Sequence, residues 1–190
     1  MGVAYRVHRI GPGDWEPYRE VRLAMLRDAP EAFGERWADA AALPEAEWRD
    51  RAARQSWPAT IGVAAVTPDG DWVGLAGGYV VSRLAYDGEF RTAVPVAKVV
   101  SVWVDPAHRG RAAGAAELLL GTVTGWAREQ PGVGLALLEV HEGNGRARAF
   151  YERLGYAPTG GERPYPLDPA ARLLELGLDL HPAPVPGSGA

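Results

Sequence analysis

The residues best suited to chemistry form a short basic, glycine-containing loop between a strand-like run and a helix-like run. Arg109, Gly110, Arg111 and Gly114 follow the β-prone segment 96–104 and precede the helical run E-L-L-L. The first turn of a helix has unpaired backbone N–H groups and the positive end of the helix dipole. Small residues let an anion approach this backbone, and arginine adds positive charge. The arrangement is typical of pyrophosphate-binding sites, although a tight turn with solvated arginines is the simpler alternative.

A second group of residues lies between 138 and 156, in the run LEVHEGNGRARAFYERLGY. Asn144 is of a type that caps helix N-termini. Phe150 and Leu154 fall on the apolar face of the helix that follows. Tyr151 is either a further core residue or a phenol placed to donate a proton. The run therefore predicts a strand, a capped helix and one candidate acid.

Together the two runs resemble the signature blocks of the GNAT superfamily, the acetyl-CoA-dependent N-acetyltransferases. The run RGRAAG at 109–114 is similar to the family's Q/R-x-x-G-x-G/A motif, with Ala112 where the family has glycine. Alanine still offers its backbone N–H there, at a cost of about 1 kcal/mol if the position needs a positive φ. The second run is similar to L-x-V-x-x-x-N-x-x-A-x-x-F-Y-x-x-x-G-F/Y. The residues in register with that block are Asn144, Ala147, Phe150, Tyr151, Gly155 and Tyr156.

The resemblance implies an α/β fold in a single domain. The GNAT-like sheet is mixed, mostly antiparallel and twisted, with about six or seven strands flanked by about four helices. We expect the domain to span residues 1–180. Residues 181–190, HPAPVPGSGA, are expected to form a flexible Pro/Gly-rich tail.

The resemblance also implies that acetyl-CoA and an amine bind together and that the amine attacks the thioester directly. The loop N–H groups, supported by Arg109 and Arg111, would hold the pyrophosphate of CoA. The backbone of the preceding strand would align the pantetheine and polarise the acetyl carbonyl, and Asn144 would help hold the pantetheine. Tyr151 would protonate the departing thiolate. The predicted cofactor-binding residues are Val102, Trp103, Val104, Arg109, Gly110, Arg111, Ala112, Ala113, Gly114, Ala115, Asn144 and Tyr151.

The base that deprotonates the amine stays open. Amines with a pKa of about 8 to 10.4 are largely protonated at neutral pH, so a proton must leave. Some family members carry a catalytic glutamate at the spacing of Glu139, and a partly buried glutamate with a raised pKa would suit this role. His141 shares a face of the strand with Glu139 and is a second candidate; water-mediated transfer, or no dedicated base at all, is the remaining alternative. Glu139 is equally explicable as a strand residue near solvent. The predicted catalytic residues are Tyr151 and Glu139.

The elements that must position these groups follow from apolar periodicity. Two early runs joined by Pro68-Asp69-Gly70 predict an antiparallel hairpin. The strand–helix–strand unit 96–141 predicts at least one parallel pair. Leu84–Pro95 is predicted to be a long loop, which would line the acceptor pocket with the first two helices and the segment Thr159–Pro169. The predicted strands are 5–10, 60–66, 72–81, 96–104, 133–141 and 172–180. One helix is predicted to begin after Asp14, and further helices are predicted at 44–54, 112–129 and 144–154.

Composition restricts the alternatives. The chain has 190 residues, 47% of them hydrophobic and 23% charged, with a net charge of −4. This balance argues against a nucleic-acid or membrane partner. The absence of cysteine excludes a disulfide, a thiolate metal site and a cysteine nucleophile, and no metal is expected. No signal peptide or spanning segment is evident, so the cytoplasm is the expected compartment.

Two questions of function stay open at this level. A CoA-binding sensor or interaction module of the same fold, without turnover, is the alternative to an enzyme. A homodimer is compatible with the fold by analogy alone.

Overall fold

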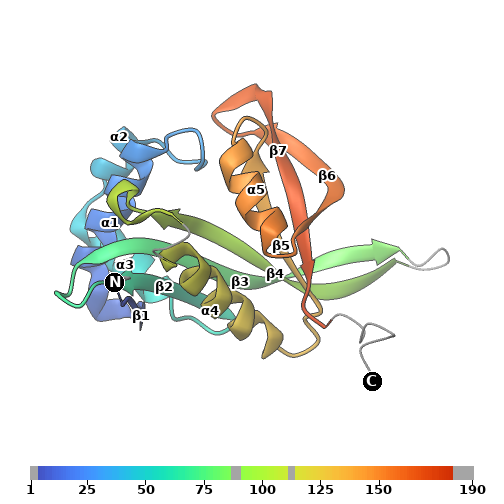
Figure 1. Cartoon of the computed structure of the whole chain (residues 1–190), viewed down its shortest axis with the longest axis horizontal. Coiled ribbons are helices and arrows are strands. Elements are labelled where there is room, and N and C mark those ends of the chain that lie inside the picture. Colours follow the sequence, from blue (N-terminus) through green and yellow to red (C-terminus); the bar gives the residue numbers. More distant parts are fainter. Residues whose placement is uncertain (1–3, 87–90, 111–113, 182–190) are drawn as a thin grey trace.

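The computed structural model describes residues 4–86, 91–110 and 114–181 (Figure 1). The helical elements are η1 (Pro12–Asp14), α1 (Trp15–Asp28), α2 (Trp37–Ala41), α3 (Glu45–Arg54), η2 (Pro106–His108), α4 (Ala115–Arg128) and α5 (Gly145–Arg153). The strands are β1 (Arg6–Arg9), β2 (Thr60–Val66), β3 (Trp72–Tyr86), β4 (Arg91–Val104), β5 (Leu135–His141), β6 (Ala157–Tyr165) and β7 (Asp168–Asp179). These strands form one seven-stranded sheet in the order β1-β2-β3-β4-β5-β7-β6. The predicted mixed, mostly antiparallel fold is confirmed.

Two apolar clusters lie on opposite faces of this sheet. On one face, Met25 of α1 and Trp48 of α3 pack against Leu75 and Trp103. On the other, α4 and α5 pack against the sheet through residues such as Leu119 and Tyr151. The helices therefore cover both faces, as the alternating pattern of elements predicts.

The parallel pair at the centre of the sheet is short. Strands β4 and β5 pair only at Ala97↔Ala136 and Lys98↔Leu137. Beyond these pairs β4 continues to Val104 and β5 to His141, and Figure 1 shows the two halves of the sheet diverging there. The split leaves strand backbone on both sides of a cleft. One cavity is lined by both diverging strands, and a second lies beside it against β4, α4 and α5.

The prediction of a long loop at Leu84–Pro95 is wrong for the residues described. Strand β3 runs to Tyr86 and β4 starts at Arg91, with register pairs such as Leu84↔Ala93. Each strand supplies the other's hydrogen-bond partners across the hairpin, and the composition of either segment alone does not reveal this pairing. Proline is tolerated at Pro95 because β4 pairs with β5 only from Ala97, so one edge of β4 has no neighbour there. Residues 87–90 lie outside the described part.

The segment Thr159–Pro169 was expected to lie between the last strands. Most of it instead belongs to a strand. Its sequence, rich in Pro and Gly, contains most of β6, which pairs with β7 alone as the last strand of the sheet. The register shifts twice along the pair, between Pro158 and Glu162 and again between Pro164 and Tyr165. An edge strand of this kind carries a weak sequence signal, because Pro and Gly are tolerated at edges and bulges.

Two further expectations concern the C-terminal tail and membrane-spanning segments. Of the tail 181–190, only His181 is described. Among the helices that are described, none is both long and apolar enough to cross a membrane.

Candidate functional site

A bulge in β4 faces the cleft. Between the register pairs Leu75↔Trp103 and Gly77↔Val100, β4 has two residues, Ser101 and Val102, where β3 has one. Ser101 adopts a φ of 58°, which is uncommon for a residue other than glycine. Arg22 of α1 donates a hydrogen bond of 3.0 Å to the Ser101 hydroxyl. Bulges re-aim the backbone and are frequent beside active sites, and this one lies in the strand that the sequence predicts for the thioester.

The start of α4 explains two of the glycines in the basic loop. Gly110 has a φ of 118° and Gly114, which precedes the first residue of α4, has a φ of 71°. A Cβ at either position would meet nothing within 4 Å. Backbone conformation, and not lack of space, is therefore what favours glycine here. Three of the predicted cofactor-binding residues, Arg111, Ala112 and Ala113, lie outside the described residues.

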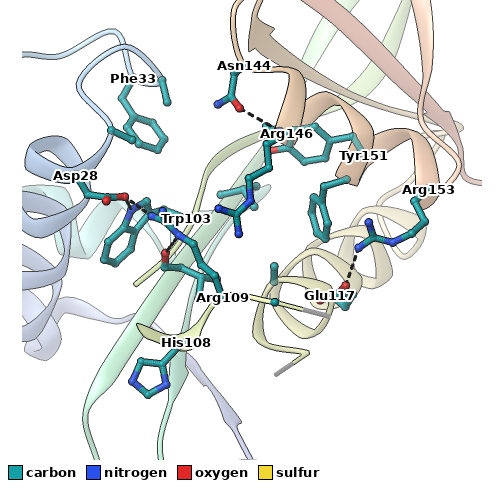
Figure 2. A pocket seen from close by; sticks show the side chains of 18 residues that line it. Asp28, Phe33, Trp103, His108, Arg109, Glu117, Asn144, Arg146, Tyr151 and Arg153 are labelled. Carbon is teal, nitrogen blue, oxygen red and sulfur yellow. Dashed lines mark hydrogen bonds and ion pairs between the residues drawn. The ribbon is translucent and has the colours of Figure 1, made fainter. Parts of the chain in front are cut away.

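A cavity of about 370 Å³, here called the helix-side cavity, lies between this loop, the end of β4 and the first turn of α5. Asn144 and Tyr151 lie in its wall (Figure 2), and so does Val102. Its other predicted members are Trp103, Val104, Arg109 and Gly110. Gly114 and Ala115 are not in the lining, and the Ala115 side chain is buried in the core.

The Arg109 side chain is held by protein groups. Its Nε donates to the Val104 carbonyl oxygen at 2.7 Å, and its Nη2 forms an ion pair with Asp28 at the end of α1. The Trp103 indole donates to the same carboxylate at 2.8 Å. Burial by itself would raise the pKa of Asp28, but the hydrogen bonds from Trp103 and Arg109 hold it below its usual value. Arg109 thus ties β4 to α1, and its guanidinium is engaged by the Val104 carbonyl and the Asp28 carboxylate.

Arg146 is the cation of this cavity that the sequence analysis missed. It lies in the first turn of α5 and points into the helix-side cavity (Figure 2). In the described part of the chain it forms no ion pair or side-chain hydrogen bond, whereas Arg153 is paired with Glu117 at 2.9 Å. The sequence does contain a signal for this residue. A positive side chain in the first turn of a helix is unfavourable towards the helix dipole, so its presence there indicates a role other than stabilising the helix.

Asn144 and Tyr151 lie where their block of sequence predicts. The Asn144 side chain accepts a hydrogen bond of 3.0 Å from the Ala147 N–H, so it caps α5. The Tyr151 ring lies edge-on to Phe150 and Tyr156 and is 8% exposed. Burial raises the pKa of the Tyr151 phenol far above its usual value. The phenol therefore keeps its proton at neutral pH.

A second cavity of about 380 Å³, here called the sheet-side cavity, opens beside the first. Glu139 of β5 lies in its wall and accepts hydrogen bonds from Nε and Nη2 of Arg163, at 2.9 and 2.6 Å. The hydrogen bonds and charge of Arg163, helped by the charge of Lys98, hold the pKa of Glu139 below its usual value despite partial burial. Glu139 therefore lacks the raised pKa that would suit a general base. The physical reason is a partner 24 residues away in the chain.

His141, the second candidate base, also lines the sheet-side cavity. Its Nδ1 accepts a hydrogen bond of 3.1 Å from the Gly143 N–H. Because a backbone N–H only donates, the proton of the neutral ring must reside on Nε2. His141 can therefore donate a hydrogen bond from Nε2 and cannot accept a proton there.

The two cavities share part of their walls. Val102 of the bulge, Tyr151 of α5 and Phe33 line both. Phe33 lies between α1 and α2, in a segment held by Glu35, which pairs with Arg22 at 2.8 Å and Arg51 at 2.6 Å. A site with this geometry can hold two ligands end to end, with a phenol and a bulged strand where they meet.

The fold is thus a split mixed sheet, with the start of α4 and two cavities that share wall residues beside the cleft. The chain belongs to the acetyltransferase (GNAT) family, whose profile matches residues 22–156. It is an acetyltransferase by that membership. A search of curated proteins finds no significant match.

Solved structures of similar fold agree with this assignment. The chain is similar to Arabidopsis thaliana NAA60, solved with acetyl-CoA: 16% identity, 94% of this chain, 100% of that chain and a TM-score of 0.68. A GCN5-related N-acetyltransferase from Kribbella flavida is 22% identical over 93% and 98% of the two chains, with a TM-score of 0.66. Salmonella typhimurium yncA, a putative acetyltransferase solved with acetyl-CoA, is 16% identical over 98% and 99%, with a TM-score of 0.66. At these identities the likeness concerns the fold.

Proposed function

We propose that this protein transfers the acetyl group of acetyl-CoA to an amine by direct attack within a ternary complex. The observation that carries the proposal is the position of Tyr151, in the wall that the helix-side and sheet-side cavities share. The thioester would lie at this junction, with CoA in one cavity and the amine in the other. Direct attack then needs no protein-bound intermediate.

The helix-side cavity is suited to CoA. The pyrophosphate would accept hydrogen bonds from the loop around Gly110 and from the first turn of α4. Arg146 adds an unpaired positive charge among the described residues, and Asn144 lies beside the expected path of the pantetheine. The Arg109 guanidinium does not serve this purpose in our proposal, because Asp28 and the Val104 carbonyl hold it. Its part is to fix the end of β4.

The proton transfers follow from the side chains at the junction. Attack by the neutral amine on the carbonyl carbon forms the C–N bond, and the C–S bond then breaks to release CoA thiolate. Tyr151 donates its proton to the sulfur and is re-protonated from solvent. The amine's proton goes to water, because Glu139 is held by Arg163 and His141 carries its proton on Nε2.

Calorimetry with acetyl-CoA and CoA, followed by a thiol-release assay over a panel of amines, tests the proposal. We expect binding of both ligands and amine-dependent release of CoA. Absence of binding at millimolar ligand would contradict the proposal. Binding without turnover of any amine would favour a CoA-binding module of the same fold.

A further inference from the structure

The sheet-side cavity has more positive than negative groups in its wall. Arg22, Lys98 and Arg163 line it, and Glu139 is the one carboxylate among its described lining residues. Such a lining is unexpected for a site that would attract only cationic amines. It points to an acceptor that also carries a negative group.

The charges lie on adjacent strands and do not cancel. Glu139 of β5 and Glu175 of β7 are register partners. Lys98 bonds to Glu175 at 3.0 Å and lies 3.9 Å from Glu139, while Arg83 pairs with Glu175 at 3.0 Å and Arg163 with Glu139. Among the residues that the structure describes, three cations thus surround two carboxylates, an excess of one positive charge.

Arg163 has the donors that such a ligand would need. Glu139 takes up its Nε and one N–H of Nη2. Guanidinium carries five N–H donors, so those of Nη1 and the second of Nη2 remain, and the side chain is 49% exposed. Arg22, in contrast, uses Nε, Nη1 and Nη2 on Glu35 and Ser101. The Nε2–H of His141 is a further donor in the same cavity.

We propose that the acceptor is a small amine bearing a carboxylate, such as a free amino acid, and that Arg163 binds this carboxylate. The inference rests on the proposed acetyl transfer and adds the acceptor's chemical class to it. Guanidinium and carboxylate form strong charge-assisted hydrogen bonds. The cavity volume of about 380 Å³ is at the low end of the range for small-molecule sites. Phe33 and Tyr165 provide apolar surface for a side chain.

Matched acceptors test the proposal. L-phenylalanine is compared with phenethylamine, and L-methionine with 3-(methylsulfanyl)propylamine, each rate being expressed per concentration of neutral amine. We expect kcat/KM to be about ten- to a hundredfold higher for the carboxylate member, the range for a hydrogen bond to a charged group. Equal or better use of the decarboxylated amine by the wild type would overturn the carboxylate assignment.

Two double variants locate the effect. Arg163→Gln with Glu139→Gln removes the pair without leaving an unpaired carboxylate, and should abolish the preference through KM while acetyl-CoA affinity is kept. Arg172→Gln with Glu162→Gln removes a comparable exposed pair, 2.5 Å apart and outside the cavity, and should keep the preference. A preference that survives in the first variant would refute the role of Arg163.

Failure of the acceptor class is distinguishable from failure of acetyl transfer. Acetyl-CoA binding with turnover only of carboxylate-free amines, or of peptides whose carboxylates are remote from the amine, overturns the acceptor class alone. No acetyl-CoA binding, or binding without turnover of any amine, overturns both proposals.

Discussion

The Tyr165 hydroxyl lies 2.9 Å from the Phe33 carbonyl oxygen, although 132 residues separate the two in the chain. The same hydroxyl lies 3.1 Å from the Pro30 carbonyl, so its single proton is shared between two acceptors. Strand β6 is thereby fastened to the segment between α1 and α2, whose Phe33 lines both cavities, while Tyr165 lines the sheet-side cavity.

Removing this contact should loosen the acceptor site. We expect Tyr165→Phe to raise the KM for the amine several-fold and to lower the free energy of unfolding by about 1 kcal/mol, the typical net value of one hydrogen bond. Acetyl-CoA affinity, measured by calorimetry, should change little, because the pyrophosphate site is formed by other elements. An equal loss of affinity for both substrates would show that the contact does not act on the acceptor side.

Tyr151→Phe should lower kcat by about ten- to a thousandfold, the range for one acid–base group, with unchanged acetyl-CoA affinity. Burial raises the pKa of Tyr151 above its ordinary 10.0. The wild-type phenol therefore keeps its proton as the pH rises to 10, and kcat should show no decline from its ionisation below that pH.

Tyr156→Phe is the matched control for Tyr151. Tyr156 is packed against Tyr151, and its buried hydroxyl has no hydrogen-bond partner among the described residues. Removing it should leave kcat unchanged and should not lower stability, because an unsatisfied buried hydroxyl is lost. A kcat that falls as much in Tyr156→Phe as in Tyr151→Phe would point to packing and not to proton donation.

Glu139→Gln should leave the shape of the kcat/KM profile between pH 6 and 9 unchanged. Arg163 keeps the pKa of Glu139 below 4.5, so the carboxylate is ionised throughout that range. The same lowered pKa means that ionised Glu139 stabilises the fold above about pH 4.5 and that this contribution is lost as the pH falls through the folded-state pKa.

The effect of Glu139→Gln on stability and its effect on the rate profile are measured separately. Denaturant unfolding should show Glu139→Gln less stable than wild type at pH 7, with the difference shrinking in acid. In the rate profile, loss of an ionisation between pH 6 and 9 would instead identify Glu139 as the base.

Arg146→Gln should weaken CoA binding by about tenfold, because a charge-assisted contact to phosphate is lost. The effect should decrease at high salt and should be absent for a pantetheine thioester that has no phosphate. Arg148→Gln is the control: it removes a cation of the same helix that lies outside both cavities and is 3.9 Å from Glu152. Equal losses in the two variants would indicate a general charge effect.

Local features of the site were predictable where short-range physics decides them. Asn144 caps α5, Tyr151 follows at the predicted place in the helix, and Gly110 and Gly114 adopt positive φ in the loop before α4. Cap hydrogen bonds and φ preferences involve neighbours within a few residues, so the sequence contains them directly. The parallel pairing of β4 with β5 also followed from a strand–helix–strand unit.

The sequence by itself determined the family and the order of the chemistry-bearing segments; the tertiary structure decided what each charged group does. Arg109 is tied to Asp28, 81 residues away, and Glu139 to Arg163, so distant partners hold the charges of both predicted site residues. Only sheet order and the divergence of β4 from β5 bring these groups together. Ionic partners depend on distances across the fold, which no local pattern encodes.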